Sequence, residues 1–507
     1  MRPHPDLSGT APKPTWLPIA LGSLLRLVQI WMPVVGVHSW RQADTAAMAR
    51  HFSQAGTPIW LPQIDWGGAS AGFVESEFPL YPFLVSRLYS LIGVEEWLGR
   101  GLSVLCSALT IWLMMRLGRR WFSPEAGWWA GMAFAIAPLG VYYGRAFQAE
   151  ALLVLCAAGA LEAHSIWVER RKAWAVSLSW ICFSTAALIK VIPLLWLGLP
   201  LLLVQLTPSP LAKAESPQQI LQRLLRLTLN PWFWVYASTA LAVTSAWYLH
   251  AYQLGEASGL TFGFWGEDSD RSNIGLALNL SSWVNLAIRT GLRALVVAGV
   301  PLIVIGTMRS WRRGGGRIAL GGVIGMLICT VATMRSSTVH EYYQFPFLLF
   351  SSPLVGLGWQ TLQYKQRRWT IQMLLSITLI ASLSILSFDY WAVETRRLST
   401  WMPLAESIRK EIPVNARVVC VTDSDPTLLN LARRQGWIIP SRELTIDQLK
   451  KLKDDGASYL TGSLNWRNTY TPMQEAESNR IRELIQAHNI SFIRSEEHTS
   501  ELQSPVT

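Results

Sequence analysis

Ionisable and aromatic side chains recur in the short segments between the apolar stretches of this chain. The first such segment, HSWRQADTAAMARHF at residues 38–52, contains Arg41 and Asp44, which would share one face of a helix because they are three positions apart. Four later segments contribute further acids, cations and rings. They are Glu75 with Glu77, Arg145 with Glu150, Lys190, and His340 with Tyr342 and Tyr343.

Carboxylates and cations together at a membrane boundary suit group transfer from a lipid-phosphate donor. An Arg or Lys side chain binds the phosphate leaving group and offsets the charge that develops as the bond breaks. A carboxylate takes the proton from an acceptor hydroxyl or amine. Charges near hydrocarbon are costly, so those that topology does not require are functional candidates.

Each candidate residue is therefore expected to have a role in such a transfer. Asp44 would act as the base or orient the acceptor, and Glu77 would position the acceptor or help hold a divalent ion. The expected donor-phosphate residues are Arg41, Arg145, Lys190 and His340. The expected substrate-binding residues are Glu75, Glu150, Tyr342 and Tyr343.

A simpler alternative stays open at this point. Arg41 would pair with Asp44 on its own helix, Arg145 with Glu150, and His340 with nothing in particular. Each cation would then be satisfied locally, and the segments would share no ligand.

The composition indicates that the chain is a membrane protein. Half of the 507 residues are hydrophobic and 15% are charged, whereas a soluble domain averages about 25% charged residues. Much of the net charge of +11 lies in short loops between apolar stretches, which is typical of positive-inside topology and argues against nucleic-acid binding. The five cysteines show no paired spacing and indicate neither a disulfide framework nor a metal site.

About eleven transmembrane helices are expected in residues 1–388, with the N-terminus inside and the C-terminus outside. Parity places the segments 37–97, 251–283 and 335–342 on the outer side. Residues 79–93 are short and contain Arg87, so a helix lying in the membrane interface is expected there. The apolar stretches lie near residues 16–36, 98–115, 126–143, 147–167, 173–189, 191–206, 232–250, 284–307, 318–334, 343–362 and 370–388.

After residue 388 the pattern changes to alternating strands and helices. It predicts a small extracytoplasmic α/β domain over residues 389–494, with at least part of its sheet parallel. We interpret this domain as a structural or acceptor-facing appendage, because it has no glycine-rich phosphate loop. The predicted strands are 416–422 and 457–463, and the predicted helices are 427–436 and 445–456, each ending on a glycine.

The end of the chain is polar and lacks periodicity. Residues 489–494 (NISFIR) predict a last strand, and residues 495–507 predict a disordered tail. The string at 495–507 resembles adapter-derived translations. Its native origin is therefore left open, and we assign it no function.

Four stretches of the sequence resemble a known family. Residues 38–52, PQIDWGG at 62–68 and ESEFPLYPFLVSRLYSLIGVEEWLGRGLS at 75–103 are similar to bacterial members of glycosyltransferase family 39, as is HEYYQFP at 340–346. This family includes the aminoarabinose transferase of lipid A and the protein O-mannosyltransferases. The resemblance covers roughly residues 16–390. It implies the multi-span GT-C architecture, a bacterial inner-membrane location and a polyprenyl-phosphate-sugar donor.

The family pattern maps onto this chain with two departures. Asp44 matches the acidic residue of the first outer loop that the family uses as its base, but Thr45 stands where many relatives have a second acid. Glu77-Phe78-Pro79 stands where relatives often have Lys-Pro-Pro. The resemblance therefore implies that Arg41, Arg145 or Lys190 takes the place of that phosphate-binding lysine. Arg145 with Glu150 matches a further Arg and acid pattern of the family.

The leading interpretation is an inverting glycosyltransferase that moves one sugar from a polyprenyl phosphate to a lipid, glycan or protein acceptor on the outer face. A flippase or transporter of lipid-linked sugar is one rival, and it predicts ionisable residues near the midplane, where only Arg26 lies well inside a span. A non-catalytic membrane scaffold is the other rival. No cofactor is indicated beyond an optional divalent metal, whose ligands the spacing does not show.

Overall fold

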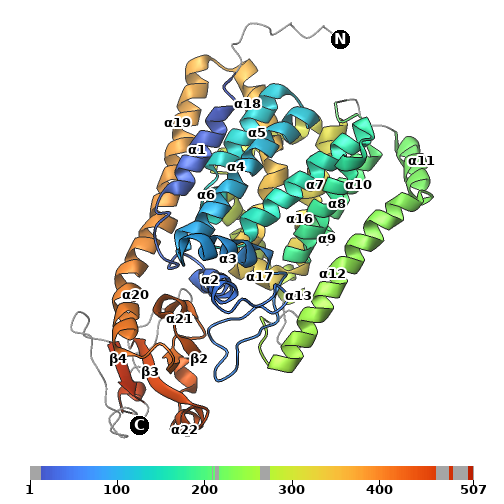
Figure 1. Ribbon diagram of the computed structural model, residues 1–507. Coiled ribbons are helices and arrows are strands. Elements are labelled where there is room, and N and C mark those ends of the chain that lie inside the picture. Colours follow the sequence, from blue (N-terminus) through green and yellow to red (C-terminus); the bar gives the residue numbers. More distant parts are fainter. Residues whose placement is uncertain are drawn as a thin grey trace.

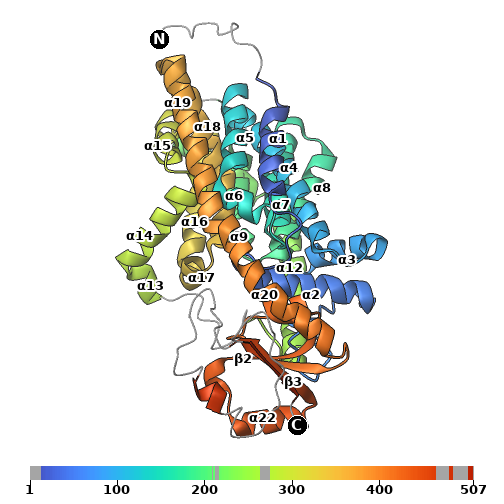
Figure 2. The ribbon, with the colours of Figure 1, turned by 90° about the vertical axis from the view of Figure 1, so that its left-hand side faces the viewer.

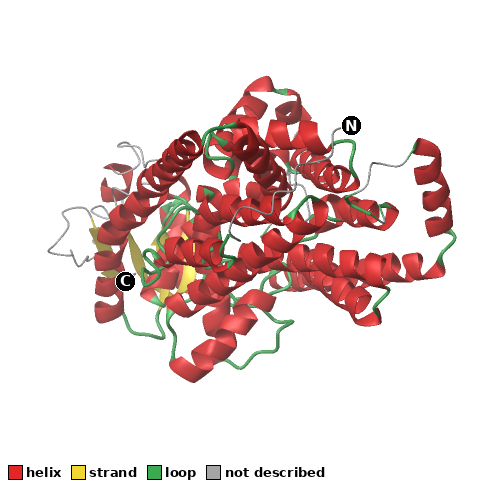
Figure 3. Cartoon of the chain, turned by 90° about the horizontal axis from the view of Figure 1, so that it is seen from above, coloured by secondary structure: helices red, strands yellow, loops and turns green. Residues whose placement is uncertain are grey.

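Figure 1 shows a bundle of helices with a small α/β domain beneath one end of it. Viewed from above, the strands lie to one side of the bundle (Figure 3). The computed structural model describes residues 13–207, 209–211, 216–262, 274–463, 479–483 and 501–505.

The helical body extends from α1 to α20 and includes two π-helical turns and one 3-10 helix. Its first half comprises α1 Trp16–Leu27, α2 Ser39–Gln54, α3 Leu80–Ile92, α4 Glu96–Trp121, α5 Pro124–Ile136, α6 Pro138–Tyr143, α7 Glu150–Arg170, α8 Ala173–Ile189, α9 Pro193–Trp196, α10 Gly198–Leu206 and α11 Pro217–Thr228. Its second half comprises α12 Pro231–Ser258, α13 Ile274–Leu278, α14 Leu280–Arg289, η1 Thr290–Ala294, α15 Gly299–Ser310, α16 Gly314–Ala332, α17 Met334–Val339, η2 Glu341–Phe347, α18 Leu348–Lys365, α19 Arg368–Ile385, η3 Leu386–Trp391 and α20 Ala392–Glu411.

The predicted apolar stretches fall mostly on helical elements, although residues 28–36 of the first stretch form turns and loop after α1 ends at Leu27. The predicted number of about eleven spans is not confirmed. Four helices in the described residues are long and apolar enough to cross a membrane, or five if one bent pair counts as a single span. The four are Glu96–Trp121, Glu150–Arg170, Gly314–Ala332 and Arg368–Glu411. Shorter apolar helices lie at Trp16–Leu27, Leu80–Ile92, Ala173–Ile189 and Pro193–Leu206.

One expected span, 126–143, is broken between α5 and α6, and a buried arginine occupies the break. Pro138 begins α6 and has no N–H, so the carbonyl of Phe134 loses its helical partner. The fully buried Arg26 of α1 donates to that region, at 3.0 Å to the Ala135 carbonyl and 2.9 Å to the Gly140 carbonyl. Arg26 therefore joins α1 to the α5–α6 break.

A second expected span, 284–307, is also broken. Leu280–Ala294 and Gly299–Ser310 meet at an angle of 93°. Val296 and Val297 between them have positive φ angles of 51° and 57°, which β-branched residues rarely adopt. The chain thus changes direction here within a few residues, and α13 and α14 project from one side of the bundle (Figure 2).

The helix α19–η3–α20 runs without a gap from the bundle to the α/β domain, and α2 and α3 lie across the same end of the bundle (Figure 2). The domain contains β1 Arg417–Val421, α21 Thr427–Ala432, β2 Gln435–Ile439, η4 Ser441–Glu443, α22 Ile446–Asp454, β3 Ala457–Ser463 and β4 Glu501–Pro505. Its strand order is β2-β1-β3-β4, with β1 parallel to β2 and β3. The predicted α/β order and the partly parallel sheet are therefore present.

One local prediction in this domain is wrong. The helix expected over 427–436 ends at Ala432, followed by Arg433 in the left-handed region, and residues 435–439 form β2. Gly436 is thus a strand residue, and a Cβ there would meet the Val418 carbonyl oxygen of β1 at 1.9 Å. The close approach of the two strands explains the glycine.

The two predictions at the chain end have different outcomes. The strand expected over 489–494 lies outside the described residues. Within the predicted disordered tail, Glu501–Pro505 forms β4, which pairs antiparallel with β3.

Candidate active site

Helix α2 lies at the end of the bundle next to the α/β domain (Figure 2), with most of its length buried. Arg41, Thr45 and Met48 recur at helical spacing along one side and line a pocket. Asp44 does not line this pocket, although it is only one turn from Arg41. Its carboxylate accepts a 2.9 Å hydrogen bond from the indole Nε1 of Trp66 instead.

Four segments that are far apart in the sequence form the pocket. The lining residues are Arg41, Thr45, Met48, Ser76, Glu77, Phe78, Pro79, Pro82, Ala149, Glu150 and Ile189. Prolines and small residues bring the backbone close to the charged side chains. The sequence prediction that Arg41, Glu77 and Glu150 belong to one site agrees with this geometry.

Two ion pairs organise the charges of this site. Arg41 pairs with Glu77, and Lys190 pairs with Glu150 at 2.6 Å. The Lys190 ammonium also lies over the rings of Tyr342 and Tyr343, 4.7 and 4.9 Å from their centroids. The local alternative, in which Arg41 pairs with Asp44 and Arg145 with Glu150, is therefore wrong for both pairs.

His340 belongs to an aromatic group beside these ion pairs. Its ring stacks on Tyr342 at 5.3 Å and lies 5.3 Å from His38 and 5.5 Å from Trp40. Burial, together with His38, Lys190 and Arg41, lowers the pKa of His340 to about 3. His340 is therefore neutral at physiological pH, and it cannot supply the positive charge expected of it.

The Asp44 carboxyl differs from Glu77 and Glu150 because it has no salt bridge among the described residues. Burial raises its pKa to about 8, against the lowering effects of the Trp66 hydrogen bond and of Arg41. The nearby carboxylates of Asp65 and Asp425 raise it further. Asp44 therefore exchanges its proton near neutral pH, as a general base requires.

Arg145 lies outside the pocket. Its guanidinium pairs with Glu394 of α20, together with that of Arg100, and all three side chains are buried. Arg100 and Arg145 each donate to the Gln29 carbonyl at 3.3 Å. The structure thus brings Arg145 to the junction of α4, α7 and α20 and does not bring it to Arg41.

Glu75 also points away from the pocket. Its backbone N–H donates to the Leu260 carbonyl at 3.0 Å, and its carboxylate accepts from the Thr261 hydroxyl. Glu75 therefore ties the first outer loop to the end of α12. Its expected contact with substrate has no counterpart in these contacts.

Two charged pairings near the site were not predicted from the sequence. Asp65 accepts from Arg50 at 2.5 Å and lies 2.9 Å from the His51 Nε2, beneath α2. Glu341 accepts from Tyr143 at 2.8 Å and pairs with Arg293. For the first pairing, the only indication in the sequence was the basic pair Arg50 and His51. The second pairing had no local indication, because Arg293 and Glu341 are far apart in the sequence.

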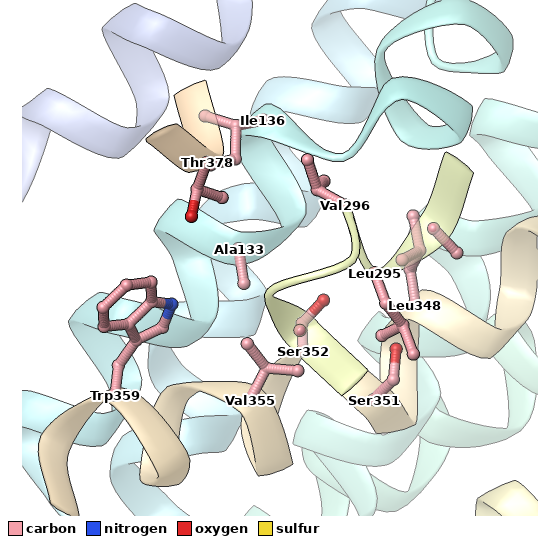
Figure 4. Close-up of a pocket in the computed structure, with 12 residues that line it drawn as sticks. Ala133, Ile136, Leu295, Val296, Leu348, Ser351, Ser352, Val355, Trp359 and Thr378 are labelled. Atoms are coloured by element: carbon pink, nitrogen blue, oxygen red, sulfur yellow. The ribbon is translucent and has the colours of Figure 1, made fainter. Parts of the chain in front are cut away.

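The site has no cluster of metal-ligating side chains in the described part of the chain. No group of three or more His, Cys, Asp or Glu side chains there is arranged to hold a metal ion. A separate apolar pocket lies between α5, the α14–α15 break, α18 and α19 (Figure 4). Its polar lining is limited to Ser351, Ser352 and Thr378, so it offers no cation to a phosphate.

Comparison with known proteins gives a family match over part of the chain. Residues 76–250 match the family described as dolichyl-phosphate-mannose-protein mannosyltransferase. This segment includes Glu77 and Glu150 of the pocket, and Lys190, which pairs with Glu150. No curated protein matches the sequence.

Solved structures match along most of the chain. The undecaprenyl phosphate complex of ArnT from Cupriavidus metallidurans has a TM-score of 0.66 at 14% identity, with 97% of each chain covered. AglB, the archaeal oligosaccharyltransferase from Archaeoglobus fulgidus, in complex with an inhibitory peptide and a dolichol-phosphate, has a TM-score of 0.54 at 11% identity, covering 89% of this chain and 69% of that one. The arabinofuranosyltransferase AftD from Mycobacteria has a TM-score of 0.55 at 15% identity, covering 98% of this chain and 40% of that one.

These matches extend over the helical bundle and the α/β domain. Residues 76–250 are thus similar to the dolichyl-phosphate-mannose-protein mannosyltransferase family, and the chain shares the fold of the ArnT and AglB structures.

Proposed function

We propose that this protein transfers a sugar from a polyprenyl-phosphate donor to a lipid, glycan or protein acceptor on the outer face of a bacterial inner membrane. The observation that carries the proposal is the pocket in which Arg41–Glu77 and Lys190–Glu150 converge. Nothing in the packing of a helix bundle requires a buried ion pair and a partly buried one at the same pocket. A shared anionic ligand gives them a reason to converge.

The donor class follows from the fold and the pocket chemistry. The similar structures include ArnT bound to undecaprenyl phosphate and AglB in complex with a dolichol-phosphate. A polyprenyl phosphate combines an anionic head for Arg41 and Lys190 with an apolar chain for the surrounding helices. The rings of Tyr342 and Tyr343 lie beside Lys190 and would cover the sugar or hydrogen-bond to the phosphate.

The transfer is a single displacement that inverts the anomeric centre. The acceptor oxygen or nitrogen forms a bond to the anomeric carbon while the bond from that carbon to the phosphate oxygen breaks. Asp44 takes the acceptor proton. The departing polyprenyl phosphate gains negative charge, which Arg41 and Lys190 offset.

The other two carboxylates, those of Glu77 and Glu150, orient the two cations. Glu77 holds Arg41, and Glu150 holds Lys190, so each cation is oriented before a donor enters. Donor phosphate competes with these carboxylates for the two cations. A released Glu77 is then placed to orient the acceptor at the pocket wall.

A test of donor recognition needs no knowledge of the sugar. Undecaprenyl phosphate should quench the intrinsic tryptophan fluorescence of the purified protein in detergent. Undecaprenol, which lacks the phosphate, should cause much less quenching. Equal responses to the two lipids would contradict the phosphate site. Mass spectrometry of envelope glycans and lipids, with and without the protein, then identifies the sugar and the acceptor. Identical profiles would contradict the transfer.

A further inference from the structure

Two backbone hydrogen bonds connect the segment that follows α2 to β2, the edge strand of the α/β domain. The N–H of Gly68 donates to the Gly436 carbonyl at 2.8 Å, and the N–H of Gly436 donates to the Asp65 carbonyl at 2.9 Å. Trp66 lies between these two attachment points. The domain therefore fixes the backbone on either side of Trp66.

The side chain of Trp66 connects two apolar clusters. It packs against the core of the α/β domain, which includes Leu404 and Leu428. It also packs against the cluster of Met48 and Phe52 on α2. Its indole N–H is the hydrogen-bond donor to Asp44. One ring thus contacts the domain, α2 and the proposed base.

Further contacts join the domain to α2. The Thr427 hydroxyl donates to Ser39 at 3.0 Å, and Arg50 donates to Asn430 at 3.4 Å. Asn430 also donates to Glu96 at the start of α4 at 3.0 Å. The α/β domain is therefore attached to the helix that carries Arg41 and Asp44, and it is more than a tethered appendage.

We propose that the α/β domain holds Trp66 in place and that Trp66 is a positioning residue, which orients the Asp44 carboxylate through its indole N–H. The inference rests on the proposed function, because it assigns Asp44 the role of base. It also explains why Asp44 faces Trp66 while Arg41 faces the pocket. The competing explanation is that Trp66 only fills the space between α2 and the domain.

The hydrogen bond from Trp66 can be detected through the pKa of Asp44, to which the surrounding charges also contribute. Arg41 on α2 favours the ionised carboxylate, whereas Asp65 from the outer loop and Asp425 from the β1–α21 loop disfavour it. The Trp66 N–H favours the ionised form as well. Removing only that N–H therefore raises the pKa of Asp44, whereas a ring that only filled space would leave it unchanged.

The test is an infrared pH titration of the full-length protein in detergent. The carbonyl band of a protonated carboxyl that is absent in Asp44→Asn reports Asp44, and its midpoint in the unmodified protein should lie near pH 8. Trp66→Phe keeps an aromatic ring and removes the donor, so the midpoint should rise by about one pH unit. Trp180→Phe is the matched control, because it removes a 3.0 Å indole hydrogen bond to the Thr239 hydroxyl away from the site. An unchanged midpoint in Trp66→Phe would overturn the proposal.

A second pair of variants tests the contribution of the domain. Gly68 has a φ of +63°, and a Cβ there would meet the Trp437 ring at 2.5 Å, so Gly68→Ala should push the loop away from β2 and raise the same midpoint. Trp437→Ala removes that ring and serves as the alternative if Gly68→Ala does not fold. A wild-type midpoint in the folded variant would overturn the role of the domain.

The titration separates this inference from the proposed function, because it needs no substrate. Transfer by Asp44→Asn is measured on the same preparations. Normal transfer by Asp44→Asn would contradict the proposed base, whereas a raised midpoint in Trp66→Phe would still support the positioning of Asp44 by Trp66.

Discussion

Arg41 forms its ion pair with Glu77, which is 36 positions away in the sequence, and not with Asp44 on the adjacent turn of the same helix. This relationship separates two functions along α2. Arg41 faces the pocket where a phosphate would bind, while Asp44 stays free of a salt bridge and close to its neutral form at physiological pH. A direct pair between the two would have lowered the pKa of Asp44 and made its carboxylate a weaker base.

The two pocket cations should both be needed for donor binding. Arg41→Gln and Lys190→Gln should each reduce transfer by about 10²-fold or more, because the charge of the leaving phosphate goes unbalanced. Undecaprenyl phosphate binding, measured by tryptophan fluorescence, should weaken in both variants. Arg87→Gln is the control, since Arg87 donates to the Phe52 carbonyl outside the pocket. Normal binding by Lys190→Gln would remove Lys190 from the phosphate site.

Arg145 should behave as a structural residue. Arg145→Met leaves Glu394 with only Arg100 in a buried environment, so the free energy of unfolding should fall by about 3 kcal/mol. Thermal unfolding in detergent measures this loss, with the exposed Arg312→Met as control. The folded fraction of Arg145→Met should bind undecaprenyl phosphate normally. If Arg145→Met is stable but no longer binds this lipid, Arg145 contributes to phosphate binding and this prediction is wrong.

Arg26 should likewise act on stability. Its guanidinium donates hydrogen bonds to backbone carbonyls of α1 and of the α5–α6 break. Methionine has no donor, and lysine cannot reproduce the geometry of the guanidinium donors. We expect a lower Tm for both variants, with Arg26→Met the less stable. Transport chemistry would predict the opposite pattern, in which Arg26→Met is stable and only function is lost.

His340 should contribute no charge to donor binding. Its pKa is lowered to about 3, so the ring stays neutral above about pH 5. His340→Gln should therefore bind undecaprenyl phosphate within about threefold of the unmodified protein, a change below 1 kcal/mol. The affinity ratio of the two proteins should also stay constant between about pH 5.5 and 7.5. A ratio that grows as the pH falls would show that His340 is protonated in the complex.

The sequence predicted those features that depend on local pattern. Apolar length and periodicity located the helices, and the alternation after residue 388 predicted the α/β domain with its parallel pairing. Charges next to apolar stretches predicted Arg41, Glu77, Glu150 and Lys190, which the structure brings together around one pocket.

Features that depend on distant partners could not be predicted in this way. Arg145 and Glu394 are 249 positions apart, so Glu150 seemed the natural partner of Arg145. Residues 435 and 436 were expected to end a helix and instead begin β2, because β1 lies beside them. The contact of Trp66 with Asp44 likewise depends on the docking of the α/β domain, which no local pattern encodes.

The pH dependence of sugar transfer in Asp44→Asn, beside the unmodified protein, tests the central claim most directly. The unmodified enzyme should gain activity as the pH rises through about 8, because Asp44 must lose its proton to act as base. Asp44→Asn should be slower by about 10² to 10⁴-fold and should lack that rise. Transfer within about tenfold of the unmodified enzyme, with the same rise in activity, would contradict the assignment of Asp44 as the base.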